Sequence, residues 1–190
     1  MKESFREIEQ RLAQYEADLK AVKEEYLSAK NQLDNNEIVS VIPYFQYSVL
    51  LPKDQENTLK VFGSFVIKNI GTVEVNEPII CLLASPSNDI LISGKIGEHI
   101  NYDPHDNPYQ LEAWDYVNDT LKSKVEDNGE YWLKPVITKK IRPEEQLSFA
   151  NFHISYHLNQ KVPIFKVKAF FYSQELKKGV ASTNQIIIQH

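Results

Sequence analysis

The sequence predicts a mainly β protein, an antiparallel β-sandwich of residues 37–190 preceded by a long coiled-coil helix of residues 1–36. Apolar residues in the first segment recur at spacings of 3 and 4, which indicates a helix. The remainder reads as short β-rich runs separated by turn residues, which is typical of a sandwich. No βαβ alternation is present, so an α/β enzyme fold is not expected. A chain of 190 residues with 42% hydrophobic side chains suffices for one such core.

The N-terminal segment carries a narrow apolar seam of the coiled-coil type. Between the seam positions lie mostly Glu, Lys, Arg, Gln and Ala, which favour helix, and residues 1–36 contain neither Gly nor Pro. We expect the seam to mediate oligomerisation, because two apolar positions in seven form a stripe suited to a partner helix. The predicted oligomerisation residues are Phe5, Ile8, Leu12, Tyr15, Leu19, Val22, Tyr26 and Leu33.

The charges beside the seam are compatible with more than one arrangement. Parallel self-association joins opposite charges in the pairs Arg11–Glu16, Asp18–Lys23 and Glu25–Lys30. An antiparallel pairing also matches most charges, but it places Asp18 opposite its own counterpart. A helix of another protein, or the sandwich of the same chain, are the other possible partners of the seam.

Strands are expected near residues 38–51, 59–69, 79–85, 90–96, 130–139, 146–155, 163–173 and 181–189. Polar or Gly-containing turns separate them, for example Asn69-Ile70-Gly71 and Asn128-Gly129. Pro43 lies inside the first run. Because proline lacks a backbone N–H, it predicts an edge strand or a strand that changes sheets.

Residues 64–84 resemble bacterial immunoglobulin-like modules. Phe65-Val66-Ile67-Lys68-Asn69-Ile70-Gly71-Thr72 forms a strand followed by an N-x-G turn, and Pro78-Ile79-Ile80-Cys81-Leu82 follows as a partner strand. The resemblance covers about 20 residues and implies an immunoglobulin-like sandwich without functional residues. The Cys…Trp…Cys core of antibody domains is absent, since Cys81 is the only cysteine. The abundance of Lys, Asn, Ile and Glu is typical of a low-GC bacterium or its phages.

The charge and hydropathy of the sequence limit the kinds of partner and the cellular location to be expected. The formal net charge is −5, which argues against wrapping nucleic acid. Residues 98–130 carry 2 basic and 9 acidic side chains, whereas residues 131–190 carry 9 and 3. We expect no membrane span and no signal peptide, because no apolar run reaches the required length. A cytoplasmic location is therefore the expectation.

An acidic, partly helical insertion is expected at residues 98–128, with Trp114, Val117, Leu121 and Val125 on one face of its helix. It could dock a protein, cover sugar rings with aromatic side chains, bind a metal, or cap one end of the sandwich. The metal alternative would use His99, Asp103, His105 and Asp106, but their spacing matches no ligand pattern. The residues predicted to bind a protein are Tyr102, Tyr109, Trp114, Tyr116 and Trp132.

Catalysis has no positive signal in this sequence. The nucleotide-binding, hydrolase and metalloprotease motifs are missing. Cys81 lies in an apolar strand, and His153 and His157 lack the other members of a triad. The sequence thus predicts a non-enzymatic oligomeric scaffold or adaptor, without cofactor or metal, that displays a protein-binding sandwich. The alternatives are a phage tail or baseplate component and a carbohydrate-binding module.

Overall fold

The chain divides into two compact units, Met1–Ile38 and Val39–His190, and each is described by itself. In the first unit a helix is described from residue 11 to residue 26 with one gap, and residues 37–38 have no regular secondary structure. The predicted helix of residues 1–36 is therefore seen only in part, and Phe5, Ile8 and Leu33 lie outside the described residues. The computed structural model describes residues 11–12, 14–26, 37–52, 58–87, 90–97, 112–157 and 164–189.

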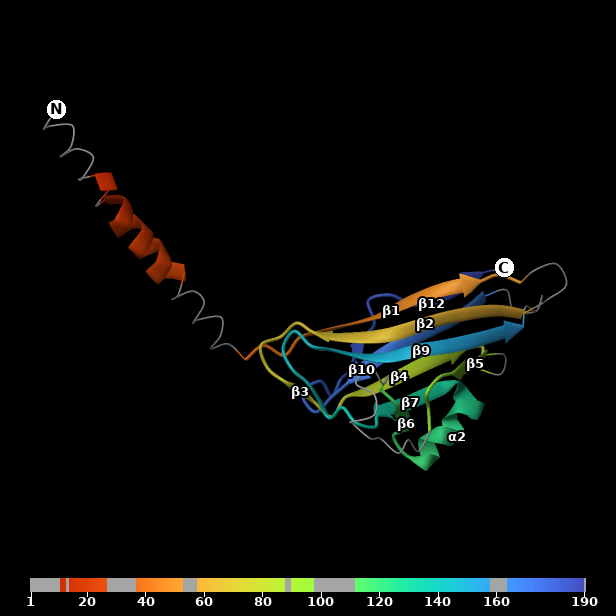
Figure 1. The fold of residues 1–190 in the computed structure, drawn as a ribbon. Coiled ribbons are helices and arrows are strands. Elements are labelled where there is room, and N and C mark those ends of the chain that lie inside the picture. The colour runs from red at the N-terminus through yellow and green to blue at the C-terminus, as the bar shows by residue number, and fades with distance from the viewer. Residues whose placement is uncertain are drawn as a thin grey trace, which may run out of the picture. The chain divides into compact units, whose positions relative to one another are not determined.

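The second unit consists of two main antiparallel sheets that form two layers (Figure 1). The first sheet has the order β1 (Val41–Leu50), β2 (Thr58–Asn69), β9 (Gln146–His157), β5 (Ile90–Ser93). The second has the order β11 (Val180–Ala181), β10 (Ile164–Tyr172), β4 (Ile79–Ser85), β7 (Glu130–Pro135), β6 (Trp114–Tyr116). Strand β12 (Ile186–Gln189) pairs with β10 on the same edge as β11, and β3 (Val75–Asn76) pairs with β8 (Lys140–Ile141).

The strand order confirms the predicted sandwich and agrees with the immunoglobulin-like resemblance. Taken in chain order as strands A to G, β1, β2, β4, β5, β9, β10 and β12 give the orders ABED and GFC. These are the two sheets of the constant-type immunoglobulin fold. Strands β6 and β7 are an addition that widens the second sheet beyond β4.

The core lies between the two sheets, where alternate residues of each strand point inward. Leu59, Val61, Phe65 and Ile67 of β2 are buried, as the alternation in that strand predicts. The sheets meet through ring stacking, with the centroids of Tyr156 and Phe165 separated by 5.2 Å. Each fully buried side chain of this size contributes roughly 1.5–3 kcal/mol of transfer free energy, so the sandwich is stabilised mainly by this layer.

Strand β1 is the edge strand that Pro43 predicts. It pairs only with β2 in the described part of the chain, in an unbroken register from Val41 opposite Asn69 to Leu50 opposite Lys60. A proline is accommodated there because its nitrogen faces the free edge and no ladder hydrogen bond is lost.

The predicted helix through Trp114 is wrong. Trp114–Tyr116 forms strand β6, and helix α2 covers only Asp119–Asn128. Asn118 caps this helix, since its Oδ1 accepts a 2.8 Å hydrogen bond from the Leu121 N–H. The residues before this cap belong to β6 and pair with β7. The apolar spacing of 3 and 4 residues that began at Trp114 and Val117 therefore ran from a strand into a helix.

Three predicted strands are shorter than expected. The runs at 90–96 and 130–139 are reduced to β5 and β7, and the run at 181–189 is split into β11 and β12. The split occurs where Thr183 and Asn184 leave the second sheet and bond to β1. The short β3–β8 pair was not predicted.

Candidate binding groove on the outer face of the first sheet

The outer face of the first sheet carries small polar side chains beside isolated exposed apolar ones. Gln46 and Ser48 of β1 alternate with inward residues, and the register places them opposite Ser64 and Phe62 of β2. Phe62 is 49% exposed, which is unusual for a phenylalanine on a sheet. The His153 ring lies beside it, with a distance of 6.3 Å between the ring centroids.

A β-bulge in β9 shapes this face. The pairing with β2 shifts between Gly63 and Phe65, which oppose Phe152 and Phe149, so β9 contains one extra residue. Asn151 adopts a positive φ of 54° there, a conformation that Asn tolerates better than most residues. Bulges often redirect side chains at functional positions. In this sheet the bulge leaves Asn151 exposed.

Glycine is required at position 63 because backbone and ring atoms approach it closely. A Cβ built there would lie 2.5 Å from the Gln46 carbonyl oxygen and 3.0 Å from Cζ of Phe152. The Phe152 ring, which is 1% exposed, thus takes the space that a side chain at 63 would need. Between Gln46 and Asn151, strand β2 carries only the small side chain of Ser64 beside this glycine.

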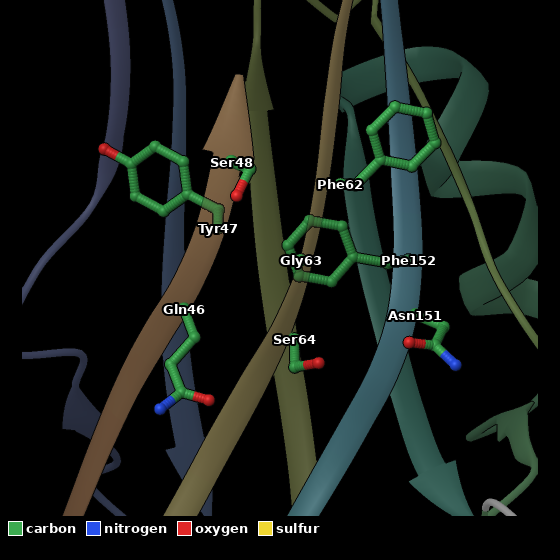
Figure 2. A pocket seen from close by; sticks show the side chains of 8 residues that line it. All are labelled: Gln46, Tyr47, Ser48, Phe62, Gly63, Ser64, Asn151 and Phe152. Atoms are coloured by element: carbon green, nitrogen blue, oxygen red, sulfur yellow. The ribbon is translucent and has the colours of Figure 1, made fainter. Parts of the chain in front are cut away.

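These features create a shallow groove of about 570 Å³ across β1, β2 and β9 (Figure 2). Hydroxyls and side-chain amides border it together with the Phe62 ring, and Figure 2 shows Tyr47 pointing away from it. No charged side chain lines it, so its chemistry suits an uncharged ligand with hydrogen-bonding groups, such as a peptide. The lining residues are Gln46, Tyr47, Ser48, Phe62, Gly63, Ser64, Asn151 and Phe152.

The residues predicted to bind a protein are not gathered in one place. Trp114 has no exposed surface, and its ring packs edge-on against Phe149, so it belongs to the core and not to a docking surface. Trp132 is partly exposed on the outer face of the second sheet, whereas Tyr116 is half-buried near α2. Tyr102 and Tyr109 lie outside the described residues.

Trp132 forms an ordered aromatic pair with Tyr172, a residue that the sequence reasoning missed. The ring centroids are 5.2 Å apart. The Trp132 Nε1–H donates a 3.0 Å hydrogen bond to Glu130, and Gly179 packs so closely on Tyr172 that a Cβ would lie 2.5 Å from the ring. Burial, followed by Cys81 and Glu130, raises the pKa of Tyr172, so the ring remains a neutral hydrogen-bonding group.

The helical seam of the first unit is exposed along its described length. Leu12, Tyr15, Leu19, Val22 and Tyr26 have exposed fractions of 59, 68, 74, 66 and 66%. An apolar stripe of this kind on an otherwise polar helix is costly in water unless something covers it.

Within the described ranges, the residues that could support catalysis or metal binding are dispersed. Cys81 is buried, at 2% exposure. Over the described ranges, no three His, Cys, Asp or Glu side chains are grouped so that they could hold a metal ion. Among the helices that the structure describes, none combines the length and the apolar character needed to cross a membrane.

Comparisons with known proteins give no family for the chain. No family model and no curated protein matches it. A collagen-binding domain from a Staphylococcus aureus adhesin matches 80% of this chain and 100% of its own length, at 14% identity and a TM-score of 0.36. A GH20 exo-β-N-acetylglucosaminidase from Vibrio harveyi matches 76% of this chain and 17% of its own length, at 11% identity and a TM-score of 0.28. At these TM-scores the likeness supports no argument, and the fold is assigned from the strand order alone.

Proposed function

We propose that the protein is a non-enzymatic scaffold that gathers several copies of one β-sandwich and presents them to a protein ligand. The observation that carries the proposal is the exposed seam on the N-terminal helix, in which Leu19 is 74% and Val22 is 66% exposed. Pairing of seams buries these side chains. Clustering then raises the avidity of a weak site without additional contacts.

The seam is tested by the solution mass of the full chain, measured by light scattering on a sizing column. We expect at least twice the 22.0 kDa of one chain. Changing both Leu19→Glu and Val22→Glu should reduce the mass to that of a monomer, because charges in the seam oppose pairing. The matched control is Ala17→Glu with Ala21→Glu, which adds the same charge outside the seam. A monomeric wild-type chain would leave a helix of another protein, or the sandwich of the same chain, as the partner of the seam.

The ligand is assigned to the groove over β1, β2 and β9. Its hydroxyls and side-chain amides match the donors and acceptors of a peptide, and the exposed Phe62 ring offers apolar contact. Tyr102, Tyr109, Tyr116 and Trp132 stay proposed protein-binding residues, and the experiment below also reports on Tyr116 and Trp132.

A capped dipeptide, N-acetyl-Phe-Ala-amide, is a suitable probe of the groove. We expect its addition at millimolar concentration to shift the backbone amide NMR signals of Gln46, Ser64 and Asn151. Ser64→Arg should abolish the shifts by filling the groove, whereas Ser155→Arg, on the same face but outside it, should not. Shifts confined to Tyr116 and Trp132 would move the site to the second sheet.

A carbohydrate-binding module is a second candidate, favoured by the Trp132–Tyr172 pair. Two rings 5.2 Å apart, fixed by Glu130 and Gly179, offer a prearranged surface for a sugar face. Because Trp114 is fully buried, any quenching of tryptophan fluorescence by added chitohexaose or cellohexaose would arise at Trp132. The candidate fails if neither sugar gives saturable quenching that Trp132→Phe removes.

A further inference from the structure

Strand β1 has a free edge whose hydrogen-bonding groups can be assigned. Backbone groups of an antiparallel strand point alternately toward and away from its neighbour. The N–H of Phe45 bonds to Asn184 and not to β2, so the odd-numbered residues of β1 face the free edge. Because the register is unbroken, the backbone groups of Pro43, Tyr47 and Val49 also face the free edge.

The chain itself closes the first half of this edge with peptide-like groups. The Pro43 carbonyl accepts a 2.8 Å hydrogen bond from the Thr183 N–H. The Asn184 side-chain amide accepts from the Phe45 N–H at 2.7 Å and donates to the Phe45 carbonyl at 2.9 Å. The amide therefore does what a peptide group of a neighbouring strand would do, which indicates the chemistry that this edge takes.

No described residue of the chain closes the second half of the edge. In the described part of the chain, the outward backbone groups of Tyr47 and Val49 have no hydrogen-bond partner. Natural edge strands are usually guarded by charge, proline or a bulge. The run from Gln46 to Leu51 has none of these, and Tyr47, Val49 and Leu50 are 39, 39 and 56% exposed.

We infer that a second copy of this chain pairs with the open edge, antiparallel and about a two-fold axis at Ser48. Tyr47 then lies opposite Val49 of the second copy, and Val49 opposite its Tyr47. Each of these pairs exchanges two backbone hydrogen bonds, because the groups at both positions face outward. The two four-stranded sheets become one continuous sheet across the axis.

Three features of the chain fit this register. The open edge holds the two outward positions, Tyr47 and Val49, that the pairing uses. Strand β1 ends at Leu50, so the second copy does not extend as far as Phe45, which is already bonded to Asn184. Ser48 meets its own counterpart, and a serine is small enough for that place. Tyr47 opposite Val49 is an aromatic–β-branched pair, which stabilises sheets, and no like charges face each other.

A cysteine at the axis provides the test in the full-length chain. Residue 48 and its counterpart form a non-hydrogen-bonded pair, in which Cα atoms are about 4.5 Å apart, within the range for a disulfide. Ser48→Cys should therefore form an intermolecular disulfide under mild oxidation. Gln46→Cys is the matched control, because position 46 lies opposite Leu50 of the second copy. Cys81 is buried and should contribute little to either variant.

We expect Ser48→Cys to cross-link at least about tenfold faster than Gln46→Cys, because the pairing sets the effective concentration of the thiols. Adding Val49→Pro should reduce the rate to that of the control. Proline at position 49 lacks the edge-facing N–H that the pairing needs, just as Pro43 lacks an N–H on the same edge. Val49→Thr, which keeps the N–H, should preserve the rate. Equal rates for the two cysteines, or no effect of Val49→Pro, would overturn the inference.

The pairing uses no residue of the helix and is too weak to hold two chains together at the concentration of the mass measurement, so the two proposals fail separately. Cross-linking in a Leu19→Glu, Val22→Glu background reports on the edge alone, at raised protein concentration. The two cysteine variants could cross-link at equal rates in that background and at different rates with the wild-type helix. This outcome would still support a pairing that needs the local concentration of clustered copies. A monomeric mass of the wild-type chain removes the scaffold proposal, while the rate ratio at position 48 continues to test the edge.

Discussion

Asn69 is a polar residue with no exposed surface, and its side chain is fully hydrogen-bonded. Its Nδ2 donates to the carbonyls of Val73 and Ile141 at 2.8 and 2.9 Å, and its Oδ1 accepts from the Gly71 N–H at 2.9 Å. The side chain thus joins the end of β2 to the following turn and to β8. An asparagine expected to close a turn is also a buried connection between distant segments.

Replacing Asn69 by leucine should destabilise the domain by roughly 2–4 kcal/mol, because the carbonyls of Val73 and Ile141 would lose their Nδ2 donor and the Gly71 N–H would keep only the Ser40 carbonyl. The measurement is the midpoint of urea unfolding at constant m-value. Asn76→Ala is a suitable control, since the Asn76 side chain makes an exposed hydrogen bond to Glu175 and its loss should cost under about 1 kcal/mol. Equal midpoints for both variants would contradict the assignment.

At the scale of elements, Glu175 ties the turn after β10 to strand β3. Its carboxylate accepts hydrogen bonds from the Asn76 N–H and Nδ2 at 2.9 and 2.8 Å, and from the Ser173 hydroxyl at 2.9 Å. Burial alone would raise the pKa of Glu175, but the hydrogen bonds from Asn76 and Ser173 outweigh it and lower the pKa. The charged form is therefore favoured in the folded state.

This shift predicts a pH dependence of stability. A carboxyl group with a lowered folded pKa stabilises fully above its unfolded pKa, about 4.3 for Glu, and the contribution is lost as the pH falls through the folded value. Glu175→Gln should lower stability at pH 7 and flatten the decline below about pH 4.3. Urea unfolding from pH 7 to pH 3 measures this, with Glu144→Gln, which is well exposed, as the comparison. A parallel decline in wild type and Glu175→Gln would count against the role of this carboxylate.

For the molecule as a whole, Asn184 connects the two sheets at their shared edge. It lies between β11 and β12 of the second sheet and bonds to Phe45 of the first through both ends of its amide. Asn184→Ala should cost roughly 1–3 kcal/mol in urea unfolding, as the loss of two hydrogen bonds in a partly buried place. Gln185→Ala, one residue further and exposed, should be close to neutral.

Most of the sandwich could be predicted from the sequence because alternation and turn residues are local signals. Strand β4 has the predicted bounds, and the edge position of β1 follows from Pro43. Trp114 was misplaced because a spacing of 3 and 4 residues also arises where a strand meets a helix. Its burial depends on packing against Phe149, which no local pattern encodes.

The groove could not be predicted as a site from the sequence, although the β-bulge that helps to form it leaves a recognisable pattern. The buried residues of β9 run Leu147, Phe149 and then Phe152, Ile154 and Tyr156, so the alternation changes phase once. That change is the signature of a bulge. The need for glycine at position 63, in contrast, depends on the approach of Gln46 and Phe152 from other strands, which only the folded chain reveals.

The pairing of β2 with β9 also determines when the protein can fold during its synthesis. Thr58 pairs with His157, and the core is completed only by Ile186, which has no exposed surface. A ribosome that has made β1 and β2 therefore releases two apolar strands long before their neighbour β9 exists. Distant contacts of this kind slow folding and leave sheet edges unpaired in the interval. The nascent chain is thus expected to need protection by a chaperone until residue 186 has left the exit tunnel.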